Sequence, residues 1–440
     1  MITKNQKYEV TIESCTQEGY GICRIDGKAV FVKGALAGEI WIILILKVTN
    51  TAIWAKGLYL VKESPMRISP DCPNNCGGCS LRHVRYEEEL RMKLEHVNSC
   101  MQRIGGQNKT VSVIHASPLV DRYRNKAIFA VAEINGKAAF GFYKPRSHEL
   151  VPVEECLLQS QNCIKAASAV VEFMNSHQIR AYDETTGKGA VRHLFWRESS
   201  SGAVICIVAA KGFGVNTRPL VEALLHSCVG LTGIVLNINK TRGNVVLSGD
   251  FYTLWGDADL EEELCGVQFS ISPRAFFQVN TPQAERIYYK VLEYAGEAKH
   301  VLDLYCGTGT ISLCLAKNGI NVTGVEIVPD AVENAKANAR RNNIASSEFI
   351  CSDAADLKTD KPFDTVVLDP PRKGLAESVI KDVVRLAPEK IIYVSCNPAT
   401  MARDLAIFNQ FHYELMDAEA FDMFPRTAHI ETVCLLTHKG

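Results

Sequence analysis

The stretch from His300 to Thr310 constrains the fold more than any other part of the chain. An apolar run, His300–Leu304, reads as a strand and leads into a Gly-x-Gly turn at Gly307 and Gly309, which a helix-like segment follows. Glycines at such a turn let the backbone approach a ligand closely. From residue 271 onward the chain alternates helical and strand patterns, which predicts a doubly wound parallel α/β sheet.

Acidic residues follow the next strands of this predicted sheet. The strand after the glycine turn ends in Glu326, the third ends near Asp353, and Asp369 follows the apolar run 365–368. Open α/β sheets bind ligands at the carboxyl ends of their strands. An acid roughly 20 residues after a glycine turn is placed to bond ribose hydroxyls, and Asp353 is placed to meet an adenine amino group.

A thiol and a further acid point to covalent chemistry. Cys396 follows the apolar run 390–395, and Glu431 begins the last strand. An exocyclic nitrogen needs no thiol to accept a methyl group. Carbon 5 of a pyrimidine does, because thiolate attack on carbon 6 makes carbon 5 nucleophilic, and a base must then remove the carbon 5 proton. A buried structural cysteine and a surface glutamate are the alternatives.

The motifs together resemble the RNA 5-methyluridine methyltransferases, which use S-adenosylmethionine. The pattern D-x-x-C-G-x-G from Asp303 resembles the first motif of class I methyltransferases, and the resemblance extends to DPPRKG, VSCNPATMARD and DMFPRTAHIET. It implies that Cys396 is the nucleophile and Glu431 the proton acceptor. It also implies a set of residues that contact S-adenosylmethionine: Gln278, Tyr305, Thr310, Glu326, Asp353 and Asp369.

The first 62 residues have a different pattern. Short β segments over 7–13, 28–32, 39–48 and 52–60 are separated by glycines, which predicts a small β-barrel. In the resemblance this region is similar to a TRAM domain that binds RNA. The chain is therefore expected to contain three domains: the barrel over 1–62, a central α/β domain over 63–270, and a Rossmann-like class I methyltransferase domain over 271–440.

Four of the 16 cysteines form a separate pattern. Cys72, Cys76 and Cys79 lie close together and Cys156 follows far along the chain. Three close cysteines with a distant fourth favour a [4Fe-4S] cluster over zinc, which usually takes two paired units. By the resemblance, the ribosomal RNA branch carries such a cluster, whereas the transfer RNA branch generally lacks both cluster and barrel. The expected substrate is therefore 23S ribosomal RNA. Transfer RNA, amino-group methylation and a non-catalytic RNA-binding factor are the alternatives.

Charge and composition fit an RNA-binding enzyme of the cytoplasm. The net charge is −1, yet residues 81–146 carry 12 Lys and Arg against 6 Asp and Glu. Within them, basic residues flank Tyr123, a pattern that suits phosphate contacts and base stacking. Phe276 and Phe277 are candidates to stack on an extruded uracil, and one of them is expected to lie in the core. With neither a long apolar run nor a signal-like N-terminus, a cytoplasmic protein without a membrane span is expected. A monomer is expected as well.

Overall fold

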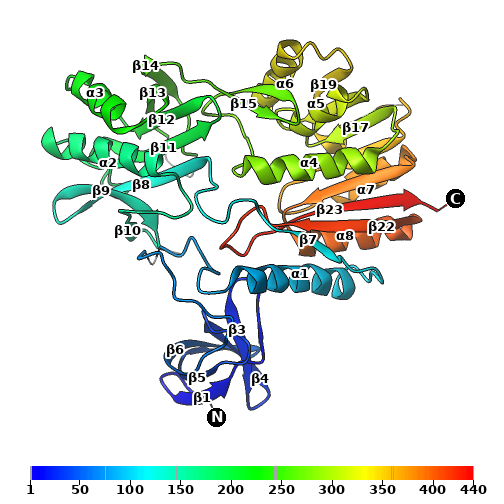
Figure 1. The fold of residues 1–440 in the computed structure, drawn as a ribbon, viewed down its shortest axis with the longest axis horizontal. Coiled ribbons are helices and arrows are strands. Elements are labelled where there is room, and N and C mark those ends of the chain that lie inside the picture. Colours follow the sequence, from blue (N-terminus) through cyan, green and yellow to red (C-terminus); the bar gives the residue numbers. More distant parts are fainter. Residues whose placement is uncertain are drawn as a thin grey trace.

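The computed structural model describes residues 2–74, 76–144, 147–241, 243, 245–357, 359 and 361–439. Within these residues the strands form sheets of six, seven, two and eight strands, in that order along the chain (Figure 1). No helix among the described residues is long and apolar enough to cross a membrane.

The N-terminal sheet has six strands in the order β1-β5-β6-β4-β3-β2. Its side chains alternate between a buried and an exposed face, as expected of a half-buried sheet, and Val30, Val32, Ile43 and Ile45 are fully buried. The predicted β segments of this region are therefore confirmed. The strands are β1 (Lys7–Thr11), β2 (Ser14–Cys15), β3 (Tyr20–Ile25), β4 (Lys28–Lys33), β5 (Ile40–Val48) and β6 (Ala52–Lys62).

The second sheet has seven strands in the order β10-β9-β8-β11-β12-β13-β14, and helices α2 (Gln161–Ser176) and α3 (Arg218–Ser227) contribute to its main core. A two-stranded hairpin, β15 (Leu260–Leu264) and β16 (Val267–Ile271), follows it. The seven strands are β8 (Lys126–Ile134), β9 (Lys137–Tyr143), β10 (Leu150–Pro152), β11 (Val191–Ser199), β12 (Gly202–Ala209), β13 (Leu231–Ile238) and β14 (Asp250–Gly256).

The eight-stranded sheet has the order β19-β18-β17-β20-β21-β23-β22-β7. The first five strands are parallel, as predicted. Strand β23 departs from the predicted parallel sheet, because it runs antiparallel to both neighbours. The short connection 422–430 explains this, because a parallel pair needs a longer crossover. The strands are β17 (His300–Leu304), β18 (Asn321–Glu326), β19 (Ser347–Cys351), β20 (Thr365–Leu368), β21 (Lys390–Ser395), β22 (Tyr413–Phe421) and β23 (Glu431–His438).

Helices cover both faces of this sheet and bury a separate core on each. One core includes side chains from α4 (Thr281–Ala295), α5 (Thr310–Lys317) and α6 (Pro329–Arg341). The other includes side chains from α1 (Tyr86–Arg103), α7 (Glu377–Arg385) and α8 (Pro398–Gln410). A 3-10 turn, η1 (Ala354–Asp356), follows β19.

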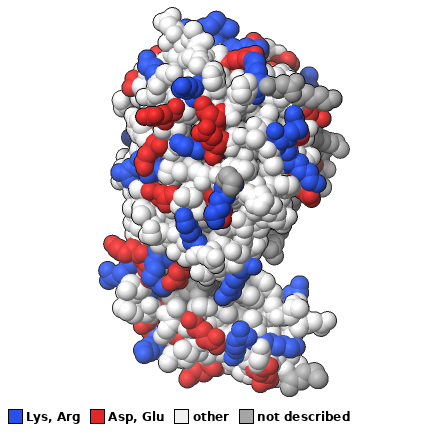
Figure 2. All heavy atoms as spheres, turned by 90° about the vertical axis from the view of Figure 1, so that its right-hand side faces the viewer, with Lys and Arg blue, Asp and Glu red and all other residues white. Residues whose placement is uncertain are grey.

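Two elements from earlier in the chain lie on this C-terminal sheet. Strand β7 (Val113–His115) pairs in parallel with β22 at the edge of the sheet. Helix α1 packs beside α8. The two backbones come close just after α1, because a Cβ added at Gly105 would lie only 3.0 Å from the carbonyl oxygen of Ala402. In Figure 1 α1 lies between the N-terminal sheet and the C-terminal sheet. On the face shown in Figure 2, basic and acidic side chains are interspersed.

Candidate active site

The strand order brings the predicted site residues to one edge of the sheet. Glu326 is the last residue of β18, and Asp353, Asp369 and Cys396 follow β19, β20 and β21. Neighbouring strands end in register, since Leu304 lies beside both Val325 and Leu368, and Leu368 lies beside Tyr393. The carboxyl ends of parallel strands therefore present these side chains together, as the sequence predicted.

The glycine turn is fixed by contacts that only glycine permits. Gly309 has φ 78°, and an added Cβ would lie 2.9 Å from the Phe349 ring and 3.0 Å from the Cβ of Ala335. The backbone N–H of Gly307 donates to Glu326 Oε2 at 3.1 Å. Tyr305, between β17 and this turn, also adopts a positive φ of 66°. The turn and the acid at the end of β18 therefore form one unit, which supports the prediction that both face the same ligand.

Two acids near this turn lie in an environment that disfavours their charge. Asp303 is fully buried and accepts a hydrogen bond from Ser312 Oγ at 2.5 Å. Burial raises the pKa of Asp303 to about 7, and burial likewise raises the pKa of Asp369 to about 7. A bound ligand that carries positive charge would stabilise both carboxylates.

The remaining predicted cofactor contacts occupy the same region. Thr310 begins α5, and its Oγ1 lies 3.0 Å from the hydroxyl of Tyr288 on α4. Asp353 Oδ1 accepts from the backbone N–H of Ala355 at 2.9 Å, which caps η1. Gln278 precedes α4, and its carbonyl oxygen accepts from Asn125 Nδ2 at 2.8 Å. Tyr288 carried no signal in the sequence, because an amphipathic helix with a buried tyrosine is common in any core.

The antiparallel orientation of β23 brings the thiol and the predicted base together. Ser395 lies opposite Thr432, so Cys396 and Glu431 continue the same ladder at the same edge. Glu431 is only 8% exposed, whereas Cys396 is half-buried. In a parallel arrangement the start of the last strand would lie at the opposite edge of the sheet.

Burial and nearby carboxyls keep the free thiol protonated. Burial raises the pKa of Cys396 to about 11, with further increases from Glu431 and Asp369 and a decrease from Arg372. Burial also raises the pKa of Glu431 well above its ordinary value, and the nearby Asp369 carboxyl raises it further. The Cys396 thiol is therefore protonated at neutral pH in the free protein.

Arg372, beside the loop that contains Cys396, is held at both its backbone and its side chain. Asn397 Nδ2 donates to the Arg372 carbonyl at 3.0 Å, and Arg372 Nη2 lies 3.3 Å from His429 Nε2. Burial and then Arg372 lower the pKa of His429 to about 4, so the ring is neutral at pH 7. Its Nε2 then accepts the hydrogen bond from Arg372.

The two phenylalanines before Gln278 differ as expected, because Phe277 is buried and Phe276 is 64% exposed. The stacking role suggested for the segment around Tyr123 is not supported. Tyr123 is only 4% exposed, and its hydroxyl donates to the carbonyl of Pro425 at 3.0 Å. Its neighbour Arg122 pairs with Glu155 at 2.8 Å. The sequence could not show this, since an aromatic between basic residues looks the same whether it faces RNA or the core.

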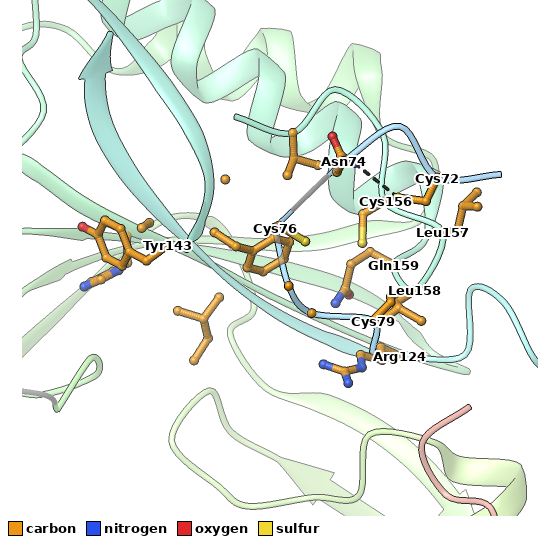
Figure 3. Close-up of a pocket in the computed structure, with 18 residues that line it drawn as sticks. Cys72, Asn74, Cys76, Cys79, Arg124, Tyr143, Cys156, Leu157, Leu158 and Gln159 are labelled. Atoms are coloured by element: carbon orange, nitrogen blue, oxygen red, sulfur yellow. Dashed lines mark hydrogen bonds between the residues drawn. The ribbon is translucent and has the colours of Figure 1, made fainter. Parts of the chain in front are cut away.

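The four patterned cysteines line one cavity of about 390 Å³ (Figure 3). All four are free thiols, and Asn74 Nδ2 lies 3.6 Å from Cys72 Sγ. Among the described residues, no three His, Cys, Asp or Glu side chains converge to hold a single metal ion. The described geometry therefore does not support the expected [4Fe-4S] cluster, although the four thiols share one cavity.

Comparison with known proteins agrees with this geometry. The family described as tRNA (uracil-5-)-methyltransferase matches residues 263–439, and the TRAM domain matches residues 3–52. An uncharacterized RNA methyltransferase of Clostridium acetobutylicum is 37% identical over 99% of this chain and 98% of its own. The chain belongs to the RNA (uracil-5-)-methyltransferase family. A second such relative, from Caldanaerobacter subterraneus subsp. tengcongensis, is 39% identical over 98% of both chains.

A solved relative extends the likeness to the whole fold. The tRNA (uracil-54, C5)-methyltransferase of Pyrococcus abyssi, in complex with S-adenosyl-L-homocysteine, is 28% identical. Its TM-score is 0.81, and the match covers 98% of this chain and 100% of that chain. The expected family, the Rossmann-like fold with its N-terminal TRAM region, and S-adenosylmethionine as methyl donor are thereby confirmed. The chain itself is therefore an RNA methyltransferase.

Proposed function

We propose that the protein methylates carbon 5 of a uridine in RNA, with Cys396 as nucleophile and Glu431 as base. The observation that carries the proposal is the convergence of Cys396, Glu431 and Asp369 at one edge of the sheet. A methyltransferase that acts on an amino group has no use for a thiol at this place. A non-catalytic RNA-binding factor has no use for either side chain.

The reaction would proceed through a covalent adduct. The Cys396 thiol first loses its proton to solvent, and the thiolate then attacks carbon 6 of uracil while the electron pair of the carbon 5–carbon 6 double bond moves toward carbon 4 as an enolate. Carbon 5 then takes the methyl group from the sulfonium, which leaves as S-adenosylhomocysteine. The Glu431 carboxylate removes the carbon 5 proton, the double bond re-forms and the Cys396 thiolate is expelled. The exposed ring of Phe276 is suited to stack on the extruded base.

The cofactor would lie between the glycine turn and the acids at the strand ends. Glu326 is assigned to the ribose hydroxyls, Asp353 to the adenine amino group, and Asp369 to the charged end of the cofactor. Gln278, Tyr305 and Thr310 complete the proposed set. The raised pKa of Asp369 suits this role, because a neighbouring positive charge stabilises the carboxylate that burial disfavours.

We further propose that Cys72, Cys76, Cys79 and Cys156 hold a [4Fe-4S] cluster. When bound, it would link the chain around Cys72, Cys76 and Cys79 covalently to Cys156, which lies before α2. Burial raises the pKa of both Cys79 and Cys156. Arg82 opposes this rise at Cys79, since a cation favours the thiolate that a cluster requires. The proposal keeps the three parts 1–62, 63–270 and 271–440 with the cluster in the central one, except that α1 and β7 pack on the C-terminal sheet.

The first candidate substrate is 23S ribosomal RNA, because the chain combines an N-terminal TRAM region with the four cysteines Cys72, Cys76, Cys79 and Cys156. Transfer RNA is the second candidate, because the Pyrococcus abyssi enzyme is a tRNA methyltransferase and aligns over its full length. That alignment weakens the expectation that the N-terminal region separates the two branches. The experiment below decides between them.

The test is a covalent trap on RNA that carries 5-fluorouridine. The protein is incubated with S-adenosylmethionine and either 23S ribosomal RNA fragments or transfer RNA, and adducts are separated on a denaturing gel. Fluorine at carbon 5 cannot be removed as a proton, so the reaction stalls after methyl transfer. We expect an adduct with the ribosomal fragments that is absent from the Cys396→Ala variant. An adduct with transfer RNA alone would move the substrate to the second candidate, and none with either RNA would refute the mechanism.

A further inference from the structure

A lysine is buried in the middle of α1, far in sequence from the active site. Lys93 is only 1% exposed. Its ammonium group donates to Glu89 Oε1 and Asp422 Oδ1, both at 2.7 Å, and to the Phe424 carbonyl at 3.2 Å. An ammonium group has three donors, and all three have acceptors here.

The partners of Lys93 make further hydrogen bonds of their own. The hydroxyl of Tyr86 donates to Asp422 Oδ2 at 2.8 Å and accepts from the backbone N–H of Ser117 at 2.9 Å. Glu89 Oε1 also accepts from the backbone N–H of Arg426 at 2.7 Å. We refer to Tyr86, Glu89, Lys93, Asp422 and Arg426 as the Lys93 network.

The network holds the segment 422–430, which joins β22 to β23 and ends directly before Glu431. Other parts of the chain hold the same segment. Leu81 donates its backbone N–H to the Arg426 carbonyl at 3.1 Å, and Asn280 Nδ2 donates to the Met423 carbonyl at 3.1 Å. Gln17, from the N-terminal sheet region, donates to the Ala428 carbonyl. The segment that leads into β23 is therefore held by contacts from several distant parts of the chain, whereas Glu431 itself pairs with Phe421 in the sheet.

The backbone of this segment needs such support. Arg426 has φ 68°, a left-handed conformation that a side chain other than glycine adopts only when its surroundings enforce it. Buried ion pairs contribute little to stability compared with apolar side chains of similar volume. Their directional hydrogen bonds, however, fix one backbone geometry, which an apolar contact does not.

We propose that the Lys93 network is a positioning device for the catalytic base. It fixes the segment 422–430 so that the Glu431 carboxyl faces carbon 5 of the uracil bound to Cys396. This inference rests on the proposed function. The loop of Cys396 is held by Asn397, which donates to the Arg372 carbonyl, and the segment 422–430 reaches this loop through His429, which accepts from the Arg372 side chain. Glu431 follows the segment directly in the chain, so loss of the network slows removal of the carbon 5 proton far more than attack and methyl transfer.

Two substrates separate these steps. RNA with 5-fluorouridine reports attack and methyl transfer through the adduct that accumulates. The same RNA with tritium at carbon 5 of uridine reports proton removal through the tritium that is released. The variants are Asp422→Asn and Tyr86→Phe, which keep the shape of the side chain and spare the fold, together with Lys93→Met. The matched control is Lys390→Met, which removes another partly buried lysine that donates to the carbonyls of Tyr294 and Ala295 at the other end of β21.

We expect Asp422→Asn to form the fluorouridine adduct within about twofold of the wild-type rate and to release tritium about 10- to 100-fold more slowly. With natural RNA, this variant accumulates adduct that the wild type resolves. Tyr86→Phe shows the same change to a smaller extent, and Lys390→Met shows none. S-adenosylmethionine affinity is unchanged in all of them.

Two results would overturn the inference. One is wild-type tritium release in both Asp422→Asn and Tyr86→Phe, whatever their melting temperatures. The other is an equal loss of adduct formation and of tritium release, since the network would then support the cleft as a whole. A wild-type enzyme that forms no adduct would instead refute the proposed function, and with it the role assigned to the network.

Discussion

The reactivity of Cys396 in the free enzyme gives a direct test of the electrostatics of the site. Burial raises the pKa of this thiol from 9.0 to about 11, and Glu431 and Asp369 add to the rise. Two pH units correspond to a roughly 100-fold smaller thiolate fraction at any pH below 9, so about 0.1% of the thiol is ionised at pH 8. Because only the thiolate is alkylated, we expect the alkylation rate to rise about tenfold per pH unit from pH 7 to 10 without a plateau.

The assay is alkylation of the free enzyme with iodoacetamide, followed residue by residue with peptide mass spectrometry. The exposed thiol of Cys351 serves as an internal reference for reagent activity. Arg372→Gln should slow alkylation of Cys396 at every pH in this range, because removal of a cation raises the thiol pKa further. Glu431→Gln should match the wild type at low pH and exceed it where Glu431 ionises, because a carboxylate opposes the thiolate. A plateau below pH 9 would show that the fold favours the thiolate, and the burial argument would be wrong.

Three further predictions concern the cofactor and RNA surfaces. Burial raises the pKa of Asp369 to about 7, so the contribution of this group to stability is present at low pH and is lost as pH rises through about 7. Asp369→Asn should therefore raise the melting temperature by about 2–4 °C at pH 8 and leave it nearly unchanged at pH 4. The same variant should lose methyl transfer. Gly309→Ala should weaken S-adenosylmethionine binding at least tenfold by calorimetry, because its Cβ would lie 2.9 Å from Phe349 at a φ of 78°; unchanged affinity would contradict the close packing of the turn. Phe276→Ala should weaken RNA binding by about 1–3 kcal/mol in a filter assay with cofactor affinity unchanged, whereas Phe277→Ala should lower the free energy of unfolding by about 3–5 kcal/mol; the reverse pattern would refute the assignment.

The sequence predicted the ends of the parallel strands well. A strand of apolar residues is recognisable by itself, and a functional residue at its carboxyl end follows directly in the chain. Glu326, Asp353, Asp369 and Cys396 were all located in this way, and their placement at one edge follows from the parallel order of the sheet. The same local logic identified the N-terminal β segments and the glycine turn.

Only the tertiary structure decided which distant segments meet. That Glu431 lies at the same edge as Cys396 depends on the antiparallel direction of β23, which a strand pattern does not encode. Glu89 and Lys93 look in sequence like an ordinary exposed i, i+4 pair on a helix, yet the packing of α1 on the C-terminal sheet buries both beside Asp422. Periodicity reports which face of an element is apolar. Periodicity carries no information about which remote segment covers a polar side chain such as Lys93. The tertiary structure alone placed Asp422, and the segment that leads to Glu431, beside it.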